Sequence, residues 1–229
     1  MTEAEPITIA IADAEPVSGL WQAPADARVA LVLAHGAGAG MTHAAMAATA
    51  GGLTQRGIAT LRYQFPYMER GSKRPDTPAV AHQAVRAAVA EARRRAPTLP
   101  RFAGGRSFGA RMTSQAQGLQ PLDGVRGLVF FAFPLHPAGK PSRERARHLV
   151  DVTLPMLFLQ GTRDALAELD LLRPTVAGLG ARARLALFED ADHSFHVRAS
   201  SGRRDADVLA EMLDLASAWM IETAGAAPV

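Results

Sequence analysis

A serine between two glycines, near the middle of the chain, limits the folds that this sequence can adopt. The segment Gly105-Arg106-Ser107-Phe108-Gly109 has the pattern Gly-x-Ser-x-Gly, which is typical of a sharp turn from a strand into a helix with the serine at its tip. A serine at such a turn has a strained backbone, so its neighbours have to be small. Because a pattern this short also arises by chance in glycine-rich turns, the flanking segments have to support it.

The segments on both sides of Ser107 favour a strand followed by a helix. Residues 102–104 are short and apolar, as in a buried parallel strand. Residues 110–117 contain no proline and predict a helix that ends at Gly118. The N-terminus of that helix would direct its partial positive charge toward whatever the serine hydroxyl attacks.

Strands and helices alternate along the rest of the chain. Further strands are predicted over residues 7–11, 17–22, 29–34, 58–63, 127–133, 155–160 and 183–188. Further helices are predicted over residues 43–56, 78–95, 143–150, 166–179 with a break near Pro174, and 205–222, and an irregular loop is predicted over 65–75. This alternation predicts an α/β fold, with a mainly parallel sheet covered by helices on both faces, in a single domain spanning residues 1–229. The site of such a sheet lies at the carboxyl ends of its strands.

Two residues at other predicted strand ends could activate the serine. A serine hydroxyl is a weak nucleophile that needs a base, and the base needs an orienting acid. Asp164 follows the strand 155–160, and His193 follows the strand 183–188. We therefore predict Ser107 as the nucleophile, His193 as general base and then acid, and Asp164 as the carboxylate that holds the imidazole.

Other carboxylates compete with Asp164 for the acidic role. Asp164 itself could instead cap a helix that begins near Ala165. Asp190 or Asp192 could supply the carboxylate, or could form hydrogen bonds within their own loop. We favour Asp164 because, of the three, only Asp164 follows a separate strand.

Other histidines compete with His193 for the role of the base. His196 lies in the same loop, but His193 comes directly after the predicted turn and is favoured for that reason. We expect His82 and His148 at surface positions of helices.

Acyl transfer also needs two backbone N–H groups that face the developing oxyanion. One should come from Phe108, the residue after the nucleophile, and the other from Ala37 in the loop after the strand 29–34. Gly36 and Gly38 flank Ala37 and would let the backbone approach closely. We expect His35 to orient this loop rather than to act in catalysis.

The glycine run after residue 34 does not fit a dinucleotide site. A third glycine would be needed at position 41, which is Met41, and an acidic residue that could bind a ribose is replaced by Arg56 and Arg62. The histidines and acidic residues have no metal-ligand spacing, so we expect neither a metal nor a cofactor.

Three segments together resemble a known family. Residues 35–41, 104–111 and 133–141 are similar to the dienelactone-hydrolase-like subgroup of the α/β-hydrolase superfamily, which the chain resembles over nearly its whole length. The resemblance implies the α/β-hydrolase fold and the same Ser, Asp and His residues as catalytic triad. True dienelactone hydrolases have a cysteine nucleophile, so the serine argues against lactone chemistry. The subgroup also includes scaffold subunits, which keeps a non-catalytic binding protein as an alternative.

The short connection between the strands 127–133 and 155–160 bears on the substrate. Many lipases insert a helical lid there, so we expect little or no lid, an open site and a small soluble ester or thioester as substrate. Arg106, Arg111 and Lys140 suggest an acidic acyl group, because guanidinium pairs well with carboxylate. Structural salt bridges are the alternative role for the two arginines. The same triad could also serve a peptidase or a transacylase.

Composition excludes several other classes of protein. The chain has 229 residues and no cysteine, which excludes disulfides and thiolate metal sites. It has no apolar run long enough for a membrane span, and its acidic N-terminus leads us to expect no secretory signal and a cytoplasmic location. The net charge is only +3, and the arginines at 93–95 suit the end of a helix, so we expect no nucleic-acid partner. The oligomeric state is left open.

Overall fold

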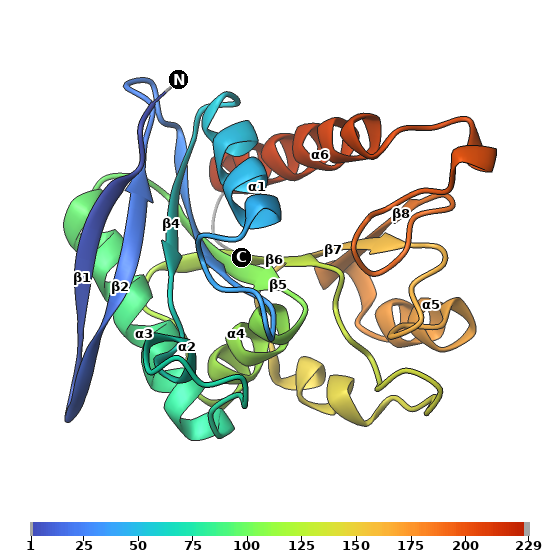
Figure 1. Cartoon of the computed structure of the whole chain (residues 1–229), viewed down its shortest axis with the longest axis horizontal. Coiled ribbons are helices and arrows are strands. Elements are labelled where there is room, and N and C mark those ends of the chain that lie inside the picture. Colours follow the sequence, from blue (N-terminus) through green and yellow to red (C-terminus); the bar gives the residue numbers. More distant parts are fainter. Residues whose placement is uncertain (1, 227–229) are drawn as a thin grey trace.

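Eight strands form one sheet through the centre of the molecule (Figure 1). The computed structural model describes residues 2–226, and the strand order across the sheet is β1-β2-β4-β3-β5-β6-β7-β8. The strands are β1 (Glu5–Ile11), β2 (Ala14–Gln22), β3 (Val29–Ala34), β4 (Ile58–Tyr63), β5 (Arg101–Arg106), β6 (Val125–Phe131), β7 (Met156–Gly161) and β8 (Ala183–Phe188).

The strands from β3 to β8 are all parallel to one another, and β2 runs antiparallel to both of its neighbours, β1 and β4. Every residue of β3, β4 and β7 is buried, which explains why these segments lack an apolar–polar alternation. The N-terminal hairpin extends one edge of the sheet, and β8 forms the other edge. The predicted fold class is confirmed by this arrangement.

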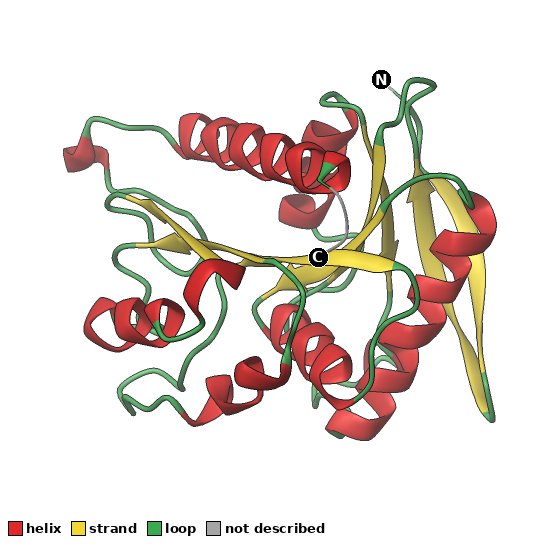
Figure 2. Ribbon diagram, turned by 180° about the vertical axis from the view of Figure 1, so that it is seen from behind, coloured by secondary structure: helices red, strands yellow, loops and turns green. Residues whose placement is uncertain are grey.

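Helices cover both faces of the sheet (Figures 1 and 2). The helices are α1 (Ala44–Thr54), α2 (Pro66–Glu69), α3 (Pro78–Arg95), α4 (Phe108–Leu119), α5 (Leu169–Ala177) and α6 (Asp205–Gly225), with 3-10 turns η1 (Glu144–Asp151), η2 (Gly180–Arg182) and η3 (Ala199–Ser201). Helices α1 and α6 lie together on one face, where Leu53 and Leu213 join the same apolar cluster. Helices α3, α4 and α5 cover the opposite face and form the second apolar cluster.

Three local predictions were wrong. Helix α4 runs through Gly118 to Leu119 instead of ending at the glycine. Helix α5 continues past Pro174 instead of breaking there. Proline has no N–H to donate to the Asp170 carbonyl, but both residues are exposed, so water can donate to that carbonyl instead. The segment 65–75, predicted as irregular, contains the single helical turn α2, which proline at its first position favours.

The connection from β6 to β7 spans residues 132–155 and contains only η1, so no helical lid is inserted there. The site at the carboxyl ends of the strands therefore stays open on this side. None of the helices in residues 2–226 combines the length and apolar character that crossing a membrane requires.

Candidate active site

Ser107 occupies a strained turn between β5 and α4. Its φ and ψ are 50° and −113°, a conformation that residues other than glycine rarely adopt, and its N–H donates to the Phe131 carbonyl at 3.0 Å. A Cβ on Gly105 would collide with the carbonyl oxygen of Ala34, and a Cβ on Gly109 would lie 2.6 Å from the same oxygen. The two glycines of the motif are therefore needed because the turn packs directly against the end of β3.

The structure brings Ser107, His193 and Asp164 into one hydrogen-bonded chain. The His193 Nε2 atom lies 2.8 Å from the Ser107 Oγ, and His193 Nδ1 lies 2.7 Å from Asp164 Oδ2. With the proton on Nδ1 donated to the carboxylate, Nε2 is left to accept the serine proton. The Asp164 side chain is completely buried, whereas a quarter of the His193 side chain is exposed, so the imidazole can meet a substrate.

The carboxylate of Asp164 is fixed by two further donors. The Gln160 amide donates to Oδ2, and the Leu166 N–H donates to Oδ1 at 2.8 Å. No helix begins near Ala165, since the chain forms a turn there and α5 starts only at Leu169. Sequence reasoning missed Gln160, although a polar residue at the end of an apolar strand was a signal for it.

Two of the competing residues in the loop after β8, Asp192 and His196, have other partners. Asp192 accepts hydrogen bonds from the N–H groups of Ser194 and His196, at 2.7 and 3.0 Å. The His196 ring pairs with Asp205 at 2.8 Å on the surface, and this carboxylate raises the pKa of His196. These contacts shape the loop that carries His193, hereafter the histidine loop (residues 189–196).

Two backbone N–H groups lie free beside Ser107. Phe108 is the first residue of α4, and Ala37 lies in the loop after β3; neither N–H donates a hydrogen bond to any group within residues 2–226. Both residues line a pocket together with Ser107. Gly38 has a φ of 78°, a backbone conformation that favours glycine. A Cβ on Gly36 would make only ordinary contacts, so of the two expected glycines only Gly38 is favoured by the geometry.

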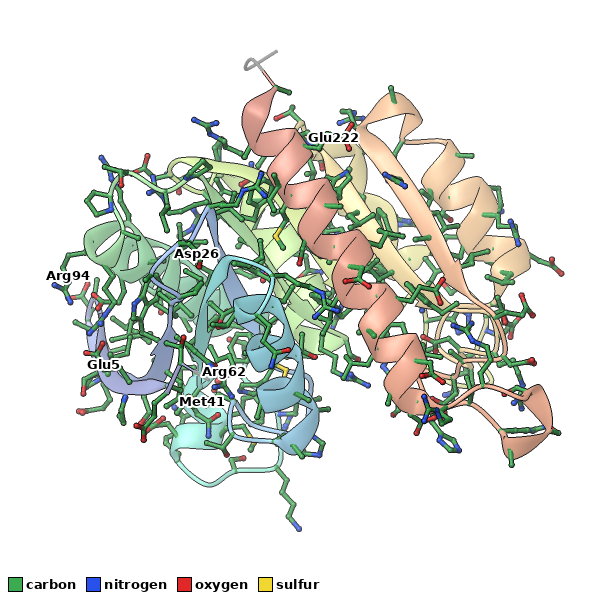
Figure 3. All side chains as sticks on the ribbon, turned by 90° about the horizontal axis from the view of Figure 1, so that it is seen from above. Glu5, Asp26, Met41, Arg62, Arg94 and Glu222 are labelled. Carbon is green, nitrogen blue, oxygen red and sulfur yellow. The ribbon has the colours of Figure 1, made fainter. Side chains whose placement is uncertain are left out.

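The loop that carries Ala37 is held by buried polar groups. His35 is fully buried; its Nδ1 lies 2.8 Å from the Gly36 carbonyl, and its Nε2 accepts the Phe65 N–H at 3.0 Å. Burial lowers the pKa of His35, so the ring stays neutral and can accept that bond. Arg62 of β4 donates to the Met41 carbonyl at 3.2 Å, and Figure 3 shows the two residues side by side.

The pocket at Ser107 has a volume of about 360 Å³. It is lined by residues of six separate segments: Ala37, Pro75, Asp76, Pro78, Ser107, Phe108, Arg111, Pro134, Arg145 and Leu166. Of the three predicted basic residues, only Arg111 is among them. Lys140 is exposed in the loop after β6 and does not line the pocket. Sequence reasoning missed Arg145, because nothing in the chain order shows that η1 packs beside α4.

Arg106 points away from the pocket, toward the histidine loop. Its guanidinium donates to the His193 carbonyl at 3.3 Å and lies 5.7 Å from the centre of the Phe195 ring. Burial lowers its pKa, and the carboxylates of Asp192 and Asp164 oppose that shift. The side chain thus has a structural partner, though a carbonyl and an aromatic ring rather than the salt bridge that was considered.

Comparison with known proteins identifies the family. A family model described as an alpha/beta hydrolase domain matches residues 27–221. The chain belongs to the alpha/beta hydrolase family. The predicted family and the general enzyme class, a hydrolase, are thereby confirmed.

Solved structures of this hydrolase fold align over nearly the whole chain. A dienelactone hydrolase from Anabaena variabilis has a TM-score of 0.79 at 18% identity, covering 96% of this chain and 98% of that one. A serine hydrolase without lid from Xanthomonas campestris has a TM-score of 0.74 at 22% identity, covering 100% and 98%. An esterase domain from Rhodothermus marinus has a TM-score of 0.72 at 15% identity, covering 96% and 98%. At these identities the likeness shows the fold.

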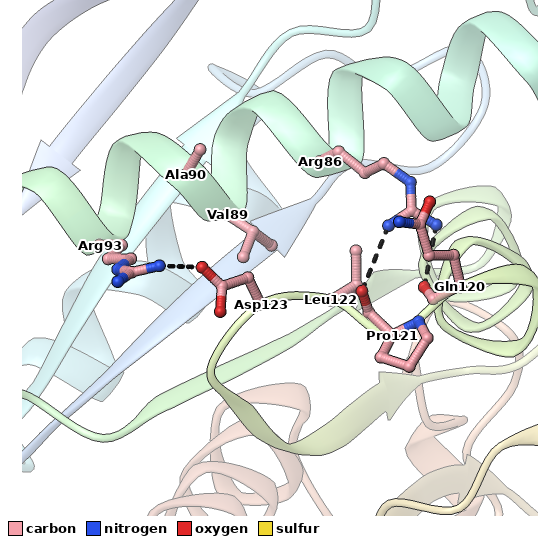
Figure 4. Close-up of a pocket in the computed structure, with 8 residues that line it drawn as sticks. All are labelled: Arg86, Val89, Ala90, Arg93, Gln120, Pro121, Leu122 and Asp123. Carbon is pink, nitrogen blue, oxygen red and sulfur yellow. Dashed lines mark hydrogen bonds and ion pairs between the residues drawn. The ribbon is translucent and has the colours of Figure 1, made fainter.

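A second pocket of the hydrolase lies between α3 and the loop after α4 (Figure 4). Its charged groups are already paired: Arg93 with Asp123, and Arg86 with the carbonyls of Gln120 and Pro121. None of Ser107, His193 and Asp164 lines this pocket. Within residues 2–226, no group of three or more His, Cys, Asp or Glu side chains could hold a metal ion.

Two histidines that were predicted at the surface are instead half-buried beside α4. His148 Nε2 lies 2.7 Å from the Ser114 hydroxyl, and His82 Nε2 lies 3.4 Å from the Gln115 amide oxygen. Burial, followed by the charge of the neighbouring Arg111, lowers the pKa of His148 to about 4. The prediction failed because α3 and η1, which carry these histidines, both pack against α4, and the sequence pattern does not reveal those contacts.

Proposed function

We propose that this hydrolase cleaves small carboxylic esters or thioesters through an acyl-enzyme intermediate on Ser107. The observation that carries the proposal is the continuous hydrogen-bonded chain from Asp164 through His193 to Ser107, with distances of 2.7 and 2.8 Å. A nucleophile bonded to a base, and a base oriented by a buried acid, are the arrangement that activates a serine hydroxyl.

In the first half of the reaction, the Ser107 oxygen attacks the carbonyl carbon while His193 Nε2 takes the hydroxyl proton. The negative charge that forms on the carbonyl oxygen is stabilised by the N–H groups of Phe108 and Ala37, which have no other acceptor among the described residues. Asp164 stabilises the imidazolium without taking its proton. When the tetrahedral intermediate collapses, the leaving alcohol or thiol receives the proton from His193.

In the second half, water replaces the alcohol. His193 takes a proton from the water as its oxygen attacks the acyl carbon, and the same two N–H groups stabilise the second oxyanion. Collapse releases the carboxylic acid and returns the proton to Ser107. The strained turn keeps the serine oxygen at the start of α4, where the helix dipole favours negative charge.

The shape of the site supports a small substrate. The pocket of about 360 Å³ is formed without a lid between β6 and β7. Two of the similar structures are a dienelactone hydrolase and an esterase domain, which supports ester chemistry. We retain esters over lactones because the nucleophile is a serine.

Labelling with a fluorophosphonate probe tests the proposal, and the chain provides a matched control. Ser114 also lies 2.7 Å from a histidine nitrogen, but it is buried and does not line the pocket. We expect wild type and Ser114→Ala to be labelled and Ser107→Ala to remain unlabelled. Hydrolysis of short acyl esters should fall by about a thousandfold or more in Ser107→Ala. If the wild-type protein is folded but is neither labelled by the probe nor able to hydrolyse short acyl esters, the result would instead support a non-catalytic binding protein.

A further inference from the structure

The half-buried arginines of this protein fall into two groups. Most donate to a carboxylate or a carbonyl; Arg56, for example, pairs with Asp214, and Arg182 bonds to the carbonyl of Val152. Arg111 and Arg145 are different, because neither guanidinium forms an ion pair or a hydrogen bond with any group in residues 2–226. The remaining arginines without a partner in that range are exposed to solvent.

Arg111 is placed next to the nucleophile by helix geometry. It lies one turn after Ser107 on α4, and its N–H donates to the Ser107 carbonyl at 3.2 Å. Its guanidinium is 6.0 Å from the centre of the Phe108 ring, and its Nε is buried without an acceptor. A half-buried guanidinium that forms no hydrogen bond with the protein favours a ligand that supplies an acceptor to its accessible nitrogens.

Arg145 reaches the same pocket from a different element. It lies on η1, which the contact between Ser114 and His148 attaches to α4 at 2.7 Å. Burial, followed by the charge of Arg145, lowers the pKa of Arg111. Two cations are therefore held on one wall of the pocket without an anion between them.

The pocket has one carboxylate, and that group is already engaged. Asp76 accepts the Tyr67 N–H at 2.7 Å and pairs with Arg70 at 2.7 Å, and its side chain is only 5% exposed. It therefore anchors α2 rather than neutralising the two arginines. The unpaired charge that faces the pocket is positive.

We propose that Arg111 and Arg145 bind a carboxylate of the substrate, so that the preferred substrates are esters or thioesters that carry a second, anionic carboxylate group. Guanidinium groups form paired, charge-assisted hydrogen bonds with carboxylates. This inference rests on the proposed function, because it concerns the specificity of the same site. The two arginines bind and position the substrate, while the hydrogen-bonded chain at Ser107 carries out the reaction.

Matched ester pairs test the proposal in the wild-type protein. The p-nitrophenyl monoesters of glutaric and adipic acid are compared with p-nitrophenyl pentanoate and hexanoate, which have the same acyl lengths. A third pair, 4-acetoxybenzoate and phenyl acetate, differs by a carboxylate on the leaving group instead of on the acyl group. For at least one pair we expect kcat/KM to be about ten- to a hundredfold higher for the carboxylated ester, mainly through a lower KM.

Variants then assign that preference to the two arginines. In Arg111→Gln and in Arg145→Gln, the ratio of kcat/KM for the carboxylated ester to that for its neutral match should fall toward one. Arg111→Lys should keep part of the ratio, because it keeps the charge but not the paired geometry. Arg147→Gln is the control: Arg147 lies on η1, is exposed and pairs with Glu144, so its loss removes one positive charge and should leave the ratio unchanged.

The outcomes separate this inference from the proposed function. If Ser107-dependent hydrolysis occurs but no pair favours the carboxylated ester, the inference is overturned and the hydrolase assignment stands. The inference is equally wrong if Arg147→Gln lowers the ratio as much as the pocket variants do. If Arg111→Gln does not fold, Arg145→Gln and Arg111→Lys still decide. Absence of both labelling and hydrolysis would remove the proposed function itself.

Discussion

Arg106 and Arg111 flank Ser107 within a few residues, yet their side chains are used in opposite ways. Arg106 donates to the His193 carbonyl and lies over Phe195, so its charge holds the histidine loop in place. Arg111 faces the pocket; its guanidinium lies 6.0 Å from the centre of the Phe108 ring but forms no ion pair or hydrogen bond with any described residue. The difference teaches that two equal charges beside a nucleophile can serve two purposes, one supporting the reacting groups and the other available to substrate.

The same contrast extends to the two sides of the site. On the side of the histidine loop, Asp164 and Asp192 both accept hydrogen bonds from protein donors. On the pocket side, the wall is built from α4 and a 3-10 turn, and it presents two guanidinium groups that have no hydrogen-bond acceptor within residues 2–226. We therefore expect changes on the first side to alter the rate of reaction for every ester, and changes on the second to alter the choice among esters.

The largest effect should come from the side of the histidine loop. Asp164→Asn should lower kcat by about a thousandfold to ten-thousandfold, because an amide cannot hold the His193 tautomer or stabilise its charged form. Steady-state kinetics should show the same factor for neutral and carboxylated esters. Asp192→Asn is the matched control, since asparagine keeps the oxygen that accepts the two loop N–H groups. Activity of Asp164→Asn within tenfold of wild type would contradict the assignment of the acid.

A smaller effect of the same kind is expected for Arg106. Arg106→Gln removes the guanidinium from the Phe195 ring and weakens the bond to the His193 carbonyl, so the imidazole is held less firmly. Misplacing a catalytic group by a small distance costs about ten- to a hundredfold in rate. We expect that loss in kcat, with little change in KM.

The ratio of carboxylated to neutral ester hydrolysis distinguishes Arg106 from Arg111. It should be unchanged in Arg106→Gln and lowered in Arg111→Gln, measured with the same ester pairs. If Arg106→Gln changed the ratio while keeping kcat, the roles assigned to the two arginines would have to be exchanged.

Much of the architecture was accessible from the sequence because it depends on local patterns. Buried parallel strands are continuous apolar runs, and the Gly-x-Ser-x-Gly pattern records a turn that packs against β3. Because parallel strands end at one edge of the sheet, Asp164 and His193 could be placed beside Ser107 before any distance was known. Their catalytic roles stay predictions until activity is measured.

The directions of side chains were not accessible in the same way. Arg106 and Arg111 look equivalent in the sequence, and only the packing of the histidine loop and of η1 shows that they diverge. Arg145 and Gln160 gain their importance from contacts between segments that the chain order does not reveal. Pro174 was misjudged because its exposure decides whether a helix tolerates it.

The last expected effect concerns the stability of the pocket wall and its response to acid. The pKa of His148 is lowered from its ordinary 6.5 to about 4, mainly by burial and then by the charge of Arg111. The unfolded chain therefore takes up a proton near pH 6.5, whereas the folded chain takes it up only near pH 4. The free energy of unfolding should fall as the pH is lowered through this window, by at most about 3 kcal/mol from this group, with no further loss below it.

His148→Gln isolates that contribution. Urea unfolding across the same pH range should give a flatter dependence in the variant than in wild type, because the other titrating groups are shared and cancel in the difference. His196→Gln is a control of opposite sign: Asp205 raises the pKa of His196, so this pair stabilises the fold at low pH and its loss should steepen the dependence slightly. Parallel curves for wild type and His148→Gln would show that His148 takes up its proton at the same pH in the folded and the unfolded chain, and below pH 6.5 η1 would then present a third positive charge beside Arg111 and Arg145. The difference between the two sides of the site would still hold after that result. The contact between His148 and Ser114, which attaches the pocket wall to α4, would however no longer depend on a neutral imidazole.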